Sequence, residues 1–238
     1  MQIKNLLIDA DHTIFDFDRC QNESLEKAFF DCKLFFQPSY CELYTSINKF
    51  YWKSFEEGKI TREQLKEQRF SHFFGQINQW TDPIVFQLKY VSHLKYSVHY
   101  YDGAVEALRL LAQKYSLALI TNGLAEVQRP RLEKSGLETL FKAVLISGEI
   151  GWAKPEKEFF LAVFEALNCS NPQDCLVIGD NLHADIYGGL QAGTRTCWFN
   201  YKNSLTKADH EPQAHYEVYN WTEVIKLLLQ PQGALTIQ

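Results

Sequence analysis

Short apolar runs that end in polar residues recur along the chain, at residues 3–8, 117–120, 143–146, 175–178 and 194–199. Runs of this length that do not alternate with polar residues are typical of strands buried on both faces of a parallel sheet. Amphipathic stretches with apolar residues at helical spacing separate the later runs, at residues 103–115, 126–135, 156–167 and 184–192. This alternation predicts an α/β fold with a Rossmann-like, doubly wound parallel sheet.

Residues 15–98 have a different pattern, because apolar positions there recur at helical spacing with few strand-like runs. The expected helices cover residues 23–35, 40–57, 61–74 and 82–95. We therefore predict a core domain formed by residues 1–14 and 99–238, interrupted by an inserted α-helical domain at residues 15–98. Most of the many aromatic residues in the insert are expected to form its core.

Composition narrows the function classes. The chain has 238 residues, 46% of them hydrophobic, and a net charge of −5, which favours a globular protein and argues against a nucleic-acid polymer as partner. No apolar run approaches the roughly 18 residues of a membrane span, and the first strand is too short for a signal peptide. The six cysteines form no C-x-x-C pair, so we expect free thiols and a cytoplasmic protein, as a monomer or homodimer.

Polar residues with chemical potential follow the predicted strands. Asp9 and Asp11 end the first strand, Thr121 and Asn122 the second, and Lys154 follows the third, while Asp180 ends the fourth with Asp185 close behind. Parallel sheets bind ligands at the carboxyl ends of their strands, so these residues are expected to converge. Several carboxylates repel one another unless a cation is present, and oxygen ligands favour Mg²⁺. A divalent cation beside an anionic substrate indicates phosphoryl transfer, in which a carboxylate can be the nucleophile.

Four of these segments, taken in order, carry a resemblance to a known superfamily. They are Asp9-Ala10-Asp11-His12-Thr13, Thr121-Asn122, Lys154-Pro155 and Gly179-Asp180-Asn181-Leu182-His183-Ala184-Asp185. The chain resembles the haloacid dehalogenase-like superfamily, which places its type-1 helical cap where residues 15–98 are inserted. The stretches 121–123, 148–155 and 192–200 further resemble bacterial pyrimidine-type 5′-nucleotidases of that superfamily.

The resemblance implies an enzyme, a phosphoric monoester hydrolase that acts on a small-molecule phosphate ester, with nucleoside 5′-monophosphates expected first. It implies that Asp9 attacks the phosphorus and that Asp11 protonates the leaving oxygen and then activates water. It implies a Mg²⁺ cofactor held by the Asp9 carboxylate, the Asp11 carbonyl and Asp180, with Asp185 in support. Phosphate oxygens are then bound by Thr121 and the Asn122 backbone, and Lys154 neutralises charge on the carboxylate of Asp9 and on the phosphoryl group.

Other interpretations remain open on the sequence alone. Asp9 and Asp11 could cap a turn, the Thr121–Gly123 segment is also a turn signal, and Lys154 could be a solvated loop lysine. Within the superfamily, a sugar-phosphate or phosphoglycolate phosphatase and a phosphomutase are alternatives. Dehalogenation is disfavoured because Asp11 and Asp180 are both present. From another class, the chain could be a non-catalytic ligand-binding protein on the same fold.

Overall fold

A computed structural model describes residues 3–204 and 212–230, which divide into two compact units. The first unit comprises residues 1–15, 100–122 and 137–238, and the second comprises residues 16–99 and 123–136. Residues 123–136 therefore group with the helical unit, whereas the sequence pattern predicts them as part of the core domain. The reason is apolar packing, since Leu124 and Val127 belong to the hydrophobic core of the helical unit.

Within the described residues, the first unit contains a six-stranded parallel sheet with the order β3-β2-β1-β4-β5-β6. Its strands are β1 (Asn5–Asp9), β2 (Ser116–Thr121), β3 (Phe141–Ile146), β4 (Cys175–Gly179), β5 (Arg195–Phe199) and β6 (Tyr216–Val218). This is the strand order of a doubly wound sheet, which reverses direction beside its first strand. The predicted α/β fold class is confirmed.

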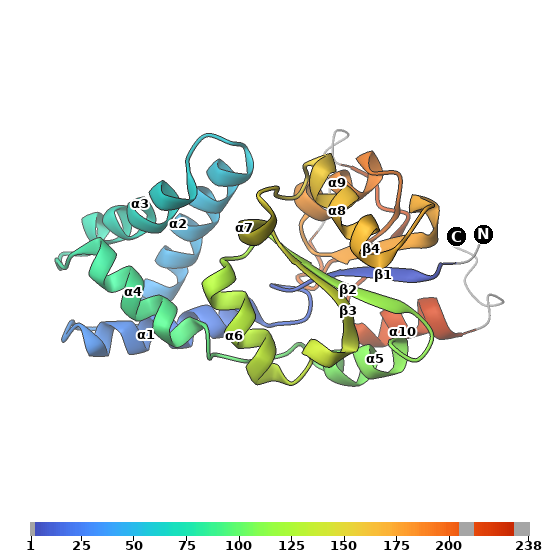
Figure 1. The fold of residues 1–238 in the computed structure, drawn as a ribbon. Coiled ribbons are helices and arrows are strands. Elements are labelled where there is room, and N and C mark those ends of the chain that lie inside the picture. Colours follow the sequence, from blue (N-terminus) through green and yellow to red (C-terminus); the bar gives the residue numbers. More distant parts are fainter. Residues whose placement is uncertain (1–2, 205–211, 231–238) are drawn as a thin grey trace. The chain divides into compact units, whose positions relative to one another are not determined.

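Helices cover both faces of this sheet (Figure 1). One side carries α7 (Ser147–Ile150), α8 (Lys157–Leu167), a π-helix (Leu182–Tyr187) and α9 (Gly188–Gln191), and the other carries α5 (Ala104–Leu111) and α10 (Trp221–Leu229). Short 3₁₀ turns at Glu138–Leu140 and Pro172–Asp174 lead into β3 and β4. Side chains at alternate positions of β1 and β2, such as Leu7, Ala118 and Ile120, pack against Phe159 and Phe160 of α8. Strand β1, which carries Asp9, thus lies in the middle of the sheet, buried on both faces.

The second unit is helical and consists of α1 (Phe17–Asp31), α2 (Ser39–Glu56), α3 (Arg62–Gln76), α4 (Pro83–Leu94) and α6 (Ala125–Ser135). Helix α1 begins six residues earlier than its apolar pattern predicted, because the side chain of Asp16 accepts the backbone N–H of Arg19. Thr61 and Gln64 form a capping box at α3, and Asp82 caps α4. Phe29 contacts a ring of aromatic side chains at the centre of the unit: Phe36, Tyr40, Phe73, Phe74 and Phe86.

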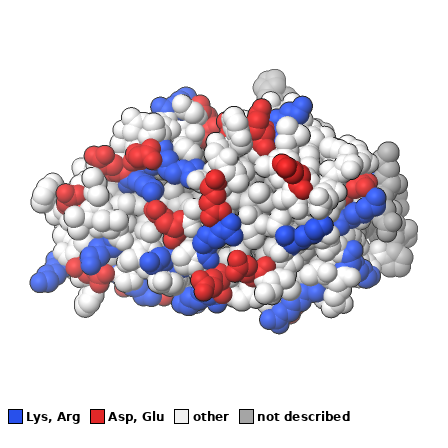
Figure 2. All heavy atoms as spheres, viewed as in Figure 1, with Lys and Arg blue, Asp and Glu red and all other residues white. Residues whose placement is uncertain are grey.

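Three general features bear on the composition-based expectations. All six cysteines are free thiols, as expected. On the face shown in Figure 2, basic and acidic side chains are interspersed over both units. In the described ranges, no helix combines the length and apolar character that crossing a membrane requires.

Candidate functional site

The carboxyl edge of the sheet brings together side chains from three neighbouring strands and the loop after a fourth. Asp9 is the last residue of β1, Thr121 is the last residue of β2, and Asp180 follows β4 directly. Because β1 pairs with both β2 and β4 in parallel, these three positions lie at one edge. Lys154 reaches the same place from the segment that follows β3 and α7.

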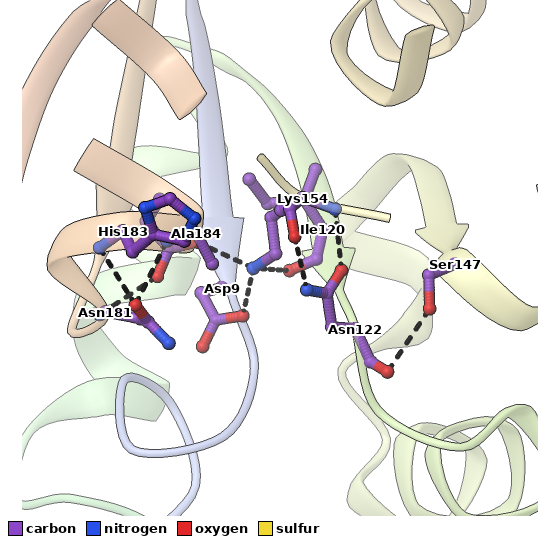
Figure 3. Close-up of polar contacts among 9 residues, drawn as sticks. Asp9, Ile120, Asn122, Ser147, Lys154, Asn181, His183 and Ala184 are labelled. Atoms are coloured by element: carbon purple, nitrogen blue, oxygen red, sulfur yellow. Dashed lines mark hydrogen bonds and ion pairs between the residues drawn. The ribbon is translucent and has the colours of Figure 1, made fainter. Parts of the chain in front are cut away.

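Lys154 is the centre of the cluster (Figure 3). Its Nζ lies 2.6 Å from Oδ1 of Asp9 and 2.6 Å from Oδ1 of Asp185, and it donates to the Ile120 carbonyl at 3.2 Å. The side chains are almost fully enclosed, with 2% of Lys154, 9% of Asp9 and 1% of Asp185 exposed. The buried ammonium group thus has one oxygen acceptor for each of its three protons. Two of these acceptors belong to carboxyl groups and the third is a backbone carbonyl. Lys154 is not a solvated loop lysine.

The backbone of Lys154 is held by Asn122. The Asn122 side chain donates from Nδ2 to the Lys154 carbonyl and accepts the Lys154 N–H at Oδ1, both at 2.8 Å. Ser147, at the start of α7, donates its hydroxyl to the Asn122 carbonyl at 3.2 Å. The Asn122 side chain therefore positions Lys154, a role that the sequence pattern did not indicate, and Ser147 was missed altogether.

The π-helix after β4 positions Asp185. Its first turn is capped by Asn181, whose Oδ1 accepts the N–H groups of His183 and Ala184 at 3.0 Å. The carboxyl group of Asp185 accepts the Asn181 N–H at 3.1 Å and lies against Gly179, where a Cβ atom would overlap it. Glycine at position 179 is therefore required by the close approach of Asp185.

Three carboxylates meet beside Lys154. One oxygen from each of Asp9, Asp180 and Asp185 lies within 4.8 Å of the others. Burial raises the pKa of Asp9 to about 8, with Asp185 adding to the rise and Lys154 opposing it. Burial and the charges of Asp9 and Asp185 hold the pKa of Asp180 well above its ordinary value. Burial lowers the pKa of Lys154, but Asp185 and Asp9 outweigh that effect and raise it.

These residues fit a hard divalent cation. Three carboxylates and one ammonium group carry a net charge of −2 when all are ionised. Burial is the main cause of the raised carboxyl pKa values, and the neighbouring carboxylates add to it. Oxygen donors without nitrogen or sulfur ligands match the preference of Mg²⁺. The structure thus brings together three of the four predicted ligand residues. Asp11, predicted to contribute its carbonyl, is half-buried in the loop after β1, and its charge adds to the rise in the pKa values of Asp9 and Asp180.

A family model for haloacid dehalogenase-like hydrolases matches residues 6–199, most of the chain. The chain belongs to this hydrolase family. All seven predicted site residues lie within the matched range, and the predicted resemblance is confirmed.

Several relatives in the family match the chain over most of its length. It is 36% identical over 197 residues to a putative hydrolase of the family, YfnB of Bacillus subtilis, covering 83% of this chain and 84% of the relative. It is 32% identical to the pyrimidine 5′-nucleotidase PynA of Streptococcus pneumoniae, with 96% of each chain covered. It is 31% identical to the pyrimidine 5′-nucleotidase YjjG of Escherichia coli, with 91% and 92% covered.

Among solved structures, this member of the family superposes on YfnB of Bacillus subtilis with a TM-score of 0.90 at 33% identity, covering 96% of this chain and 100% of the other. That crystal structure contains magnesium and is described as revealing interdomain movement. An L-2-haloacid dehalogenase from Xanthobacter autotrophicus superposes with a TM-score of 0.75 at 16% identity, which shows a shared fold.

Proposed function

We propose that this hydrolase is a Mg²⁺-dependent phosphatase that cleaves small phosphate monoesters through an aspartyl-phosphate on Asp9. The observation that carries the proposal is the buried Lys154 ammonium group, which bridges Asp9 and Asp185 at 2.6 Å beside Asp180. Such a site holds an ammonium group in direct contact with a carboxylate that can act as nucleophile. Bound Mg²⁺ would be held by Asp9, Asp180 and Asp185, with the Asp11 carbonyl, and would supply charge stabilisation for the phosphoryl oxygens.

The first chemical step follows from the arrangement of Asp9. Lys154 engages Oδ1, and the second carboxylate oxygen points away from Lys154 in Figure 3. In the proposal this Oδ2 attacks the phosphorus while the bond to the ester oxygen breaks, and Asp11 gives its proton to the departing alcohol. Thr121 and the Asn122 backbone bind phosphoryl oxygens, and Lys154 favours the ionised form of Asp9, which is the form that attacks.

The second step returns the site to its starting state. Asp11, now ionised, takes a proton from water, and the resulting hydroxide attacks the phosphorus of the aspartyl-phosphate. The bond between phosphorus and Asp9 breaks, inorganic phosphate leaves, and Asp9 is again a carboxylate paired with Lys154. Asp11 ends the cycle protonated, as it began it.

For the substrate we propose a nucleoside 5′-monophosphate. The support comes from PynA and YjjG, both named pyrimidine 5′-nucleotidases and both aligned with nearly the whole chain. Dehalogenation is not proposed, because the haloacid dehalogenase shares the fold at only 16% identity.

A metal-controlled substrate panel tests both parts of the proposal. With Mg²⁺ present we expect turnover of p-nitrophenyl phosphate and of uridine 5′-monophosphate, and loss of both on treatment with EDTA, reversed by added Mg²⁺. We expect a higher kcat/KM for uridine 5′-monophosphate than for ribose 5-phosphate or phosphoglycolate. A preference for either of the last two would overturn the substrate assignment, and no turnover of any ester would favour a ligand-binding protein.

A further inference from the structure

The loop that carries Asp11 is joined to the chain after β5 by an aromatic pair. His12 and Tyr201 stack with ring centroids 5.3 Å apart and an interplanar angle of 10°, and the Tyr201 hydroxyl lies 2.9 Å from Nδ1 of His12. Tyr201 is braced on another side by Tyr101, with centroids 5.0 Å apart. His12 directly follows Asp11, so this contact acts on the loop that holds the proposed acid–base residue.

His12 has an unusual backbone conformation. Its φ angle is 62°, in the left-handed region that residues with a side chain seldom adopt. The turn around it is tight, because the Ala10 carbonyl accepts the N–H groups of both Ile14 and Phe15, and the His12 N–H donates to the Phe15 carbonyl at 2.9 Å. Such conformations persist where surrounding contacts hold them, and they cluster at functional sites.

The turn that carries Tyr201 is itself firmly anchored. Asn200 is buried, and its backbone N–H donates to the Val218 carbonyl of β6 at 2.8 Å. Its side chain donates to the Ser204 carbonyl and to Glu217, both at 2.8 Å, and accepts the Ser204 N–H at 2.9 Å. Tyr201 therefore reaches His12 from a fixed point at the edge of the sheet.

We propose that Tyr201 is a positioning residue, which holds His12 and thereby fixes the direction in which Asp11 presents its carboxyl group to the leaving oxygen. The inference rests on the proposed phosphatase function. Loss of the contact between Tyr201 and His12 would weaken proton donation to the leaving group and leave the binding of phosphate unchanged. Tyr201 itself touches neither substrate nor metal in this account.

The leaving group provides the test. The p-nitrophenolate ion is a stable anion that departs with little protonation, whereas the 5′-oxygen of uridine must be protonated as it leaves. In Tyr201→Phe the stacking surface stays and the hydroxyl contact with His12 is lost. In single-turnover measurements with Mg²⁺ we expect release of uridine from uridine 5′-monophosphate to slow about tenfold, the effect of one hydrogen bond, and release of p-nitrophenol to change less than about twofold.

Tyr115→Phe is the matched control. Its hydroxyl donates to the Leu228 carbonyl at 2.8 Å in the same unit, so it also removes one tyrosine hydrogen bond. We expect both esters to react with Tyr115→Phe as they do with the wild type. Equal slowing of both esters in Tyr201→Phe, or no slowing of either, would overturn the positioning role.

A second variant shows whether Tyr201 acts through His12. Asparagine tolerates the left-handed region but cannot stack, so His12→Asn should reproduce the selective loss on uridine 5′-monophosphate. The double variant with Tyr201→Phe should be no slower than the slower single variant, and additive losses would contradict the proposal. If the wild type hydrolyses neither ester with Mg²⁺, the proposed function itself fails and the positioning role falls with it.

Discussion

Lys154 offsets part of the negative charge of the carboxylates at the site. It contacts two carboxylates and a carbonyl, and it is buried with them. Removing one charged partner leaves the others buried and unpaired. This loss of folding free energy is larger than the net amount by which the intact cluster stabilises the fold.

We therefore predict that Lys154→Met abolishes turnover and lowers the free energy of unfolding by on the order of 3 kcal/mol at pH 8.5 without divalent metal. The decrease in the free energy of unfolding should depend on pH. Burial raises the pKa of Asp9 to about 8, so ionisation of Asp9 lowers the stability of the folded state as the pH rises toward that value. The variant lacks the ammonium group that reduces this cost. Protonation of Asp9 at lower pH relieves the repulsion between the carboxylates. The difference in unfolding free energy between the variant and the wild type should therefore shrink as the pH falls from 8.5 to 6. Urea unfolding in EDTA measures it, and a difference independent of pH would contradict this explanation.

At the residue scale the sequence predicted which charged groups meet, but not how they are held. Asp9, Asp180, Asp185 and Lys154 were predicted from their places after buried strands, because parallel strands end at one edge. The two hydrogen bonds between the Asn122 side chain and the Lys154 backbone depend on a side-chain rotamer and on the path of the loop after β3. Local sequence does not encode either of these, since distant residues determine both. The roles assigned to all seven site residues stay predictions.

At the element scale, the turn between β4 and the π-helix is constrained by a close approach. Its geometry allows the Asp185 carboxyl group to lie where residue 179 would carry a Cβ atom.

We predict that Gly179→Ala destabilises the protein by about 1–3 kcal/mol, because the added methyl group overlaps the Asp185 carboxyl group, and lowers turnover more than tenfold by displacing that group from Lys154. Gly75→Ala is the control, since Gly75 lies in helix α3 with open space around its missing Cβ. That variant should be neutral or more stable by up to about 1 kcal/mol. Thermal melts and p-nitrophenyl phosphate turnover measure both, and wild-type behaviour of Gly179→Ala would contradict the geometry.

A second prediction at this scale concerns Glu23, which links α1 to the end of the helical unit. Glu23 contacts Lys27 at 2.7 Å, the Ser97 hydroxyl at 2.6 Å and His99 at 2.8 Å. Hydrogen bonds from Lys27 and Ser97 are the main causes that lower its pKa to about 2. A carboxyl group with a lowered pKa stabilises the fold above its ordinary pKa and loses that contribution as the pH falls toward the folded value.

Glu23→Gln should therefore lower the melting temperature at pH 7, and its difference from the wild type should narrow as the pH falls from about 4.5 toward 2. Melting curves across that range measure the effect. A constant difference would show that the Glu23 charge is not its cause.

The sequence predicted the long elements better than the short ones. Short runs of four to six residues gave β1 to β5, and helical spacing gave α1 to α4, α5, α6 and α8. Strand β6 has only three residues and α10 lies near the end of the chain, and neither was predicted. The predicted helix at 184–192 is a π-helix followed by a short α-helix, a distinction that apolar spacing cannot make.

At the scale of the whole molecule, the proposed chemistry belongs to one unit. Every predicted site residue lies in the unit that contains the sheet. The helical unit has its own aromatic core and its own capped helices. The predicted domain boundaries, the monomer or homodimer, and the absence of a nucleic-acid partner stay predictions.

The central claim is that Asp9 is the nucleophile, and turnover by Asp9→Asn tests it most directly. The substitution keeps the shape of the side chain and removes the charged oxygen that attacks phosphorus. With Mg²⁺ and p-nitrophenyl phosphate we expect kcat to fall by at least about a thousandfold, while circular dichroism and the melting temperature show a folded protein. A folded Asp9→Asn variant that turns over the ester at the wild-type rate would contradict the account.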